Sequence, residues 1–139
     1  MPQDPLADGP SEASFAEAGD AFVLRYTWTH PDDGTQTDLL LVSAPDAAGA
    51  VEGTLFDTWH QQPGVMRLTG IRSGETVSPR GTYLEEWGWE VEVTRTPTGS
   101  TMTMRNVVPA SALVDAPPEL AAMGPGPYDV MVAAWGTSA

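Results

Sequence analysis

The sequence predicts an all-β fold, an antiparallel up-and-down barrel of about eight strands with one short helix before the last strand. Two observations lead to this prediction. Large apolar residues alternate with polar ones over short segments, which is the spacing of strands with one buried face. Tight turns join nearly all of these segments, and this favours a meander. A meander leaves two unpaired edges unless it closes into a barrel. A two-sheet sandwich is the alternative, with residues 109–126 as its one long crossing.

The first predicted strand covers residues 22–29 and has the largest apolar face. Four residues share that face: Phe22, Leu24, Tyr26 and Trp28. Asp33-Gly34 follows, and this dipeptide is typical of a two-residue type I′ hairpin loop. Such a loop pairs Trp28 with Leu39 and Tyr26 with Leu41, so that apolar residues face apolar residues.

The remaining strands follow at short, regular intervals. They are expected over residues 37–43, 51–59, 65–71, 77–83, 87–95, 101–108 and 128–135. Pro79 and Gly81 weaken the fifth of the eight strands, which indicates an edge, a bend or a bulge. The turn at residues 45–50 leaves open whether Leu40 or Leu41 pairs with Leu55.

The hairpin at residues 97–100 decides what faces the tryptophans of residues 87–95. A loop of Thr98 and Gly99 would pair Val91 with Asn106. Met102, Met104 and Asn106 would then share a face with Trp87 and Trp89.

The two ends of the chain differ from this pattern. Residues 1–20 are acidic, contain prolines and have few large apolar groups, so a mobile arm is expected there, with Phe15 as its one anchor. Residues 21–139 form the single barrel domain. Near the C-terminus, a helix is expected between an N-cap at Asp115 or Ala116 and a stop at Gly124, with prolines in its first turn.

The amino-acid composition limits the classes of partner that the protein is expected to bind. The formal net charge is −13, and the six basic residues are all Arg. Such a surface repels phosphate backbones and anionic lipid heads, so no nucleic-acid or membrane partner is expected. The chain has no Cys and two His, so neither a metal site nor a cofactor is expected. Residues 1–15 lack the basic and apolar regions of a signal peptide, which favours a cytoplasmic location.

Four short motifs resemble those of a bacterial family of calycin-like barrels, relatives of the lipocalins and fatty-acid-binding proteins. They are YTW at residues 26–28, DTWH at residues 57–60, WGW at residues 87–89 and MRNVVP at residues 104–109. The likeness covers about residues 22–109. It implies a fold and no activity, because the family has no established one. The chain lacks the Gly-x-Trp signature that opens the family barrel, so its barrel is expected to close differently or with a partner.

The segment from Leu55 to Leu68 holds the residues best suited to chemistry. A loop centred on Gln62 would place Asp57 opposite Arg67, and a carboxylate on an apolar face needs such a partner. The pair could orient a polar ligand, or it could be a structural ion pair at the barrel rim. His60 would end its strand at the barrel mouth, as a general base, a ligand donor, a single axial haem ligand or an exposed loop residue.

Aromatic and thioether side chains are the second candidate set. They are Tyr26, Trp28, Trp59, Tyr83, Trp87, Trp89, Met102 and Met104. Such side chains line ligand cavities, and they also fill ordinary cores.

Three functions follow from these residues. The first is binding of a small, largely apolar molecule in the barrel interior, oriented by Asp57, Arg67, His60 or Asn106. The second is a cyclase or isomerase of bacterial secondary metabolism that uses the same pocket, with Asp57 or His60 moving a proton. The third is an interaction protein with a filled core, in which a homodimer buries an open barrel edge.

Overall fold

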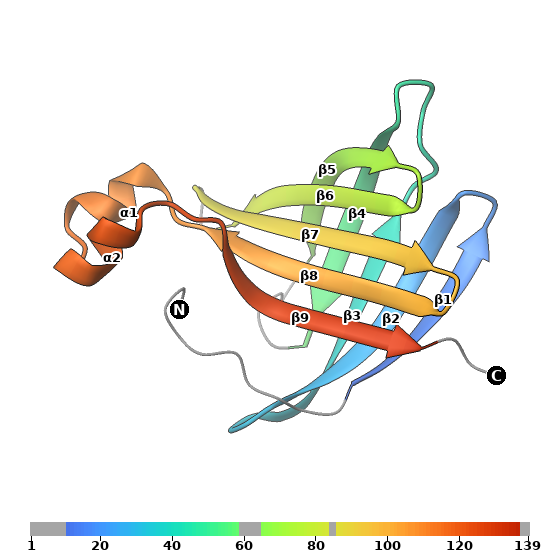
Figure 1. Ribbon diagram of the computed structural model, residues 1–139, viewed down its shortest axis with the longest axis horizontal. Coiled ribbons are helices and arrows are strands. Elements are labelled where there is room, and N and C mark those ends of the chain that lie inside the picture. The colour runs from blue at the N-terminus through green and yellow to red at the C-terminus, as the bar shows by residue number, and fades with distance from the viewer. Residues whose placement is uncertain (1–10, 59–64, 84–85, 137–139) are drawn as a thin grey trace.

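The computed structural model describes residues 11–58, 65–83 and 86–136. Nine antiparallel strands form one sheet in chain order, and the sheet curls into a nearly closed barrel (Figure 1). The prediction of an all-β up-and-down barrel is therefore confirmed. The strands are β1 (Glu12–Ala18), β2 (Ala21–His30), β3 (Gly34–Val42), β4 (Ala50–Asp57), β5 (Met66–Ser73), β6 (Thr76–Tyr83), β7 (Trp87–Thr96), β8 (Gly99–Val107) and β9 (Tyr128–Gly136).

The additional strand is β1, which lies within the segment expected to be a mobile arm. Its residues pair with β2 from Glu12 to Ala18, so the expectation of an arm is wrong for this stretch. Phe15 packs against the core, with its ring centroid 5.8 Å from that of Phe22. This strand was hard to predict because its residues are mostly small or charged. An edge strand is paired on one side only and needs few large apolar groups.

The β2–β3 hairpin has a different register from the expected one. His30 pairs with Gly34, so the loop has three residues, and Tyr26 lies opposite Asp38 instead of Leu41. An odd shift moves every side chain of a strand to the other face of the sheet. Leu39 and Leu41 are consequently 41% and 49% exposed on the outer face.

The structure also defines the β3–β4 pairing and the β7–β8 loop. Leu40 pairs with Leu55, which confirms the first of the two expected alternatives. The β7–β8 loop consists of Pro97 and Thr98, because Thr96 pairs with Gly99. This register differs from the expected one by an even number of residues, so Met102, Met104 and Asn106 face the interior as predicted.

The β6 strand is a central strand, not an edge. Its ladder with β7 is interrupted between Val77 and Arg80, where Pro79 has no N–H to donate. Gly81 lies so close to β5 that an added Cβ would be 2.5 Å from the carbonyl oxygen of Arg67. The backbone of β6 thus approaches its neighbour at a point where only glycine fits.

Two short helices lie beyond one end of the barrel, before β9 (Figure 1). The helix α2 (Pro118–Met123) corresponds to the expected one, with a proline in its first turn and Gly124 at φ 81° after it, but its N-cap is Pro117 instead of Asp115 or Ala116. The helix α1 (Ala110–Val114) was not expected. Neither helix, nor any other within the described ranges, is long and apolar enough to cross a membrane.

The barrel closes between β1 and β9 through side chains. Among the described residues, these two strands share no backbone ladder. The indole Nε1 of Trp135 on β9 donates a hydrogen bond to Ser11 Oγ, just before β1, at 2.8 Å. The Trp135 ring also contacts Tyr26, with 5.8 Å between the ring centroids. Further along β1, Arg95 of β7 forms an ion pair with Glu17 and lies over the ring of Phe15, so the open edge of β1 is bridged by side chains at two places.

Candidate functional site

The barrel interior changes from apolar to polar along its length. At one end it is filled by apolar side chains such as Phe22, Val77 and Val93. Toward the other end, where β2 and β6 finish, polar and aromatic side chains point inward. We call this region the polar half. Its members are Tyr26, Trp28, Gln36, Asp38, Asp57, Tyr83, Trp89 and Asn106.

The centre of the polar half is a row of three residues on adjacent strands. Tyr26 on β2 lies opposite Asp38 on β3, which lies opposite Asp57 on β4. Their exposed fractions are 0%, 3% and 7%. Directly opposite residues on one face have neighbouring Cβ atoms, so two carboxyl groups and a phenol meet inside the barrel.

Burial sets the protonation of this row. The pKa of Asp38 is raised from 3.8 to about 7: burial is the largest cause and the neighbouring Asp57 carboxyl adds to the rise, while hydrogen bonds from Tyr26 and Trp28 act against it. The pKa of the Tyr26 phenol is raised well above its ordinary value, first by burial and then by Asp38. Asp38 therefore changes its charge near neutral pH, whereas Tyr26 keeps its proton.

Three side chains surround the row. The indole Nε1 of Trp28 donates to Asp38 Oδ1 at 3.3 Å. The phenol of Tyr26 spans the barrel, with its oxygen 3.6 Å from the sulfur of Met104 on β8. Gln36 accepts a hydrogen bond from the hydroxyl of Thr58 at 2.7 Å, between the end of β4 and the start of β3. These contacts hold the polar groups in place before any ligand arrives.

The opposite wall is formed by β6, β7 and β8. The phenol of Tyr83 donates to Asn106 Oδ1 at 2.7 Å, and burial raises the pKa of that phenol. The Tyr83 ring meets Trp89 edge-on at 6.1 Å and Trp87 at 6.2 Å, measured between centroids. The Nε1 of Trp89 is buried and has no hydrogen-bond partner within the described part of the chain. A buried N–H without a partner is rare in folded proteins and requires a physical explanation.

This arrangement supplies two kinds of recognition. Aromatic faces offer flat apolar area, and a carboxyl near neutral pKa can accept or donate a hydrogen bond. Among the described residues, no group of three His, Cys, Asp or Glu side chains could hold a metal ion.

Most of the predicted site residues come together here. Tyr26, Trp28, Asp57, Tyr83, Trp89 and Asn106 belong to the polar half, Met104 contacts Tyr26, and Trp87 contacts Tyr83. Met102 also faces the interior, but it lies opposite Val93 toward the apolar end. Trp59 and His60 lie outside the described residues.

The predicted pairing of Asp57 with Arg67 is wrong. Arg67 lies opposite Thr54 and is exposed, between the buried Met66 and Leu68. The observed register differs from the expected one by three residues, and Asp57 lies beyond Leu55–Met66, the last pair of the β4–β5 ladder. Arg67 is therefore on the outer face, away from the polar half.

Two residues of the site were missed from the sequence, Gln36 and Asp38. The continuous run from Leu39 to Val42 allows either face of β3 to be the inner one, so a polar residue two positions before Leu40 was not recognised as inward. The length of the β2–β3 loop decides which face of β3 is the inner one. Asp33-Gly34 predicts a two-residue loop, whereas His30 pairs with Gly34 and leaves a loop of three residues.

The polar half thus combines an in-register acid row, an aromatic wall and a free indole N–H. Comparison of the chain with protein-family models, with curated proteins and with solved structures found no match.

Proposed function

We propose that the protein binds a small, largely apolar molecule in the polar half of the barrel interior. Closed or nearly closed barrels of this strand number enclose either packed side chains or one small ligand. The indoles of Trp28 and Trp89 and the ring of Tyr83 would contact the apolar body of the guest, and Asp38 and Asn106 would orient its polar group.

The observation that carries this proposal is the buried row of Tyr26, Asp38 and Asp57. Burying carboxyl groups is costly, and apolar residues of similar size would stabilise a filled core better. The other half of the interior is filled in just that way. Polar groups confined to one half are expected where a guest is recognised, because a few placed polar groups fix a ligand in an apolar pocket.

The pKa of Asp38 also limits the guest. At a pKa of about 7, the carboxyl accepts hydrogen bonds when ionised and donates one when protonated. The guest would therefore carry a single polar group, such as a hydroxyl, carbonyl or amine, at one end of an apolar body. A second charged group would have to be buried among the aromatic rings, which is unfavourable.

The test is a fluorescence titration with N-phenyl-1-naphthylamine, a neutral apolar probe whose emission rises in an apolar site. We expect a saturable rise, and Trp89→Ala should weaken probe binding at least about tenfold. Val132→Ala, on the outer face of β9, is the matched control and should leave the affinity unchanged. Thermal unfolding of each variant checks that it folds. No saturable signal, or equal effects of the two variants, would favour a filled core.

A second candidate function is proton-transfer catalysis in the polar half, as in an isomerase or cyclase. It is favoured by the pKa of Asp38, since a general base works best with a pKa near the ambient pH. Deuterium exchange at the α-carbon of 2-indanone, an apolar enolisable ketone, would test it in D₂O by NMR. Exchange above the buffer rate that Asp38→Asn removes would support an enzyme, and buffer-rate exchange would leave a binding module.

A further inference from the structure

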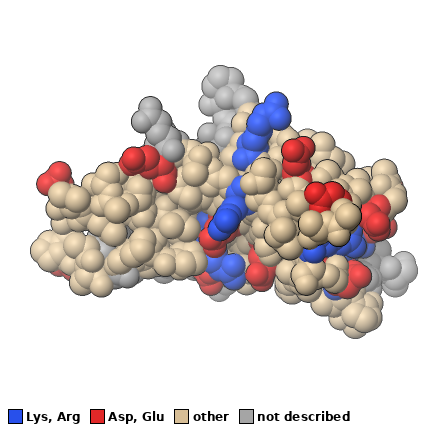
Figure 2. All heavy atoms as spheres, turned by 90° about the horizontal axis from the view of Figure 1, so that it is seen from above, with Lys and Arg blue, Asp and Glu red and all other residues tan. Residues whose placement is uncertain are grey.

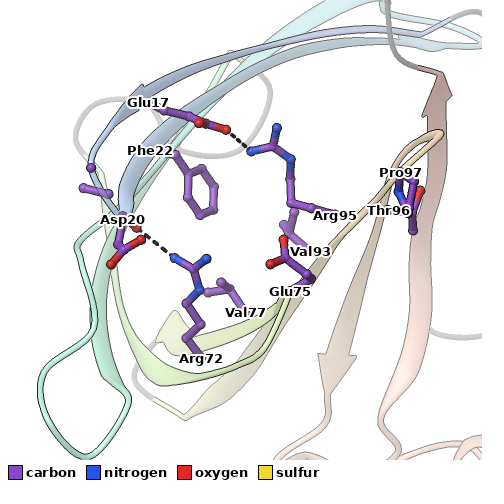
Figure 3. A pocket seen from close by; sticks show the side chains of 12 residues that line it. Glu17, Asp20, Phe22, Arg72, Glu75, Val77, Val93, Arg95, Thr96 and Pro97 are labelled. Carbon is purple, nitrogen blue, oxygen red and sulfur yellow. Dashed lines mark hydrogen bonds and ion pairs between the residues drawn. The ribbon is translucent and has the colours of Figure 1, made fainter.

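A hollow of about 430 Å³ lies at the opposite end of the barrel from the polar half (Figure 3). Three turns surround it: the β1–β2 turn with Gly19 and Asp20, the β5–β6 hairpin and the β7–β8 hairpin. Its floor is made by the buried side chains of Phe22, Val77 and Val93. A volume in the range of about 300–1,000 Å³ is typical of sites for small molecules.

The walls of this hollow are tied to one another. The guanidinium Nη1 of Arg72, on β5, donates to the backbone carbonyl of Asp20 in the β1–β2 turn at 3.0 Å. The backbone N–H of Arg95, on β7, donates to the carbonyl of Glu75 at 2.9 Å. The Arg95 side chain forms an ion pair with Glu17 and lies 4.2 Å from the centre of the Phe15 ring. The three turns are thus fixed relative to one another, so a guest would meet a preorganised site.

Arg72 has bonding capacity to spare. Its Nε and Nη1 donate to the carbonyls of Gly74 and Asp20, which carry no charge, and it forms no ion pair within the described ranges. One N–H of Nη1 and both of Nη2 are left for a guest. A guanidinium group prefers the two oxygens of a carboxylate, which it can bind side by side.

The other charges on the rim have the opposite sign. Asp20 and Glu75 both line the hollow, and neither carboxylate forms an ion pair with any described residue. A guest with a carboxylate alone would be repelled by these two groups and by the net charge of −13. A guest that also carries an ammonium group would be neutral overall and could bind Arg72 and one of the two carboxylates at once.

We infer that this hollow binds a small zwitterion of the amino-acid type with an apolar side chain. The carboxylate of the guest would bind Arg72, and its ammonium group would bind Glu75 or Asp20. The apolar side chain would lie on the floor formed by Phe22, Val77 and Val93. This site is separate from the polar half, so the inference is independent of the function proposed for the interior.

Calorimetric titration with three molecules that share a phenyl group tests the inference. L-Phenylalanine carries both charges, 3-phenylpropionate lacks the amine, and 2-phenylethylamine lacks the carboxylate. We expect phenylalanine to bind at least about tenfold more tightly than either of the others. Binding of 3-phenylpropionate as tight as that of phenylalanine, or no detectable binding of phenylalanine, would overturn the inference.

Variants locate the site. Arg72→Gln should weaken phenylalanine binding at least about tenfold, whereas Arg80→Gln, an exposed arginine on the outer face of β6, should leave it unchanged. Because Arg72 also ties two turns together, Glu75→Gln serves as a second variant without that structural role. It should weaken binding of phenylalanine and of 2-phenylethylamine but not of 3-phenylpropionate. Unchanged phenylalanine binding in both Arg72→Gln and Glu75→Gln would place any bound phenylalanine elsewhere and overturn the inference.

Discussion

The indole of Trp28 donates a hydrogen bond to the carboxyl of Asp38, with 3.3 Å between Nε1 and Oδ1. The two residues come from adjacent strands and are not directly opposite, since Trp28 pairs with Gln36. The contact is therefore diagonal, over a distance that only a long side chain can span. It places an aromatic face beside a buried acid, the combination of apolar and polar surface on which the proposed binding site depends.

The stability of the protein should depend on pH through Asp38. Its folded-state pKa is raised from 3.8 to about 7, so between these values the folded chain holds a proton that the unfolded chain has lost. The stabilisation that the protonated Asp38 carboxyl gives the folded state is complete below the unfolded pKa and is lost as the pH rises through about 7. The free energy of unfolding should fall by up to about 1.4 kcal/mol per pH unit in this window. Urea unfolding between about pH 5 and pH 8 measures it.

Asp38→Asn provides the comparison, because an amide does not titrate. The variant should lose most of the pH slope and should be more stable than the wild type above about pH 7. Glu52→Gln removes an exposed carboxylate and is the matched control, with the slope of the wild type. Parallel curves for the wild type and Asp38→Asn would show that Asp38 titrates normally.

The hydrogen bond between Tyr83 and Asn106 should be measurable as a coupling energy. Tyr83→Phe removes a 2.7 Å bond and leaves the amide of Asn106, which is 7% exposed, without that partner. We expect a loss of about 1 kcal/mol in the free energy of unfolding. Asn106→Leu on the Tyr83→Phe background should cost less than on the wild-type background. Strictly additive losses in this double-mutant cycle would mean that the bond contributes nothing.

The sequence was sufficient for the barrel and insufficient for its registers. Alternation of side chains over β2 and β7 defines strands with one buried face, and this requires only local information. Register depends on loop length and on cross-strand packing, which the apolar run from Leu39 to Val42 leaves undetermined. Asp38 was missed for this reason, whereas Met104 and Asn106 were found despite a shifted hairpin, because that shift was even.

Substitutions on β3 test the register that brings Asp38 inside. Leu40 is completely buried and Leu41 is 49% exposed. Leu40→Ala should therefore lower the free energy of unfolding by about 2–5 kcal/mol, and Leu41→Ala should change it by about 0.5 kcal/mol or less. Chemical denaturation of the two variants is a matched experiment, since both remove the same atoms from neighbouring positions. A larger loss for Leu41→Ala would restore the register expected from the Asp33-Gly34 turn.

Arg67 provides a second check on the registers. Pairing with a buried Asp57 would make Arg67→Ala cost several kcal/mol, because a buried charge would lose its partner. On the outer face of β5, where Arg67 is exposed, the same substitution should change the free energy of unfolding by less than about 0.5 kcal/mol. Equilibrium unfolding in urea distinguishes the two cases. A large loss would indicate that Arg67 contacts an acidic group inside the barrel.

The seam between β1 and β9 should be the first part of the barrel to open. No backbone ladder joins the described residues of these two strands, and the side chain of Trp135 bridges them through the bond to Ser11 and the ring contact with Tyr26. Trp135→Ala removes both contacts and should speed amide hydrogen exchange in β1 and β9 by at least about tenfold. Trp135→Phe keeps a ring against Tyr26 and should have a smaller effect.

Amides of β4 and β5, far from the seam in the sheet order, should change least, and mass spectrometry of peptic peptides resolves these strands. Equal acceleration in all strands would mean that the sheet opens as one cooperative unit, and that the contacts of Trp135 support the whole barrel and not the seam alone.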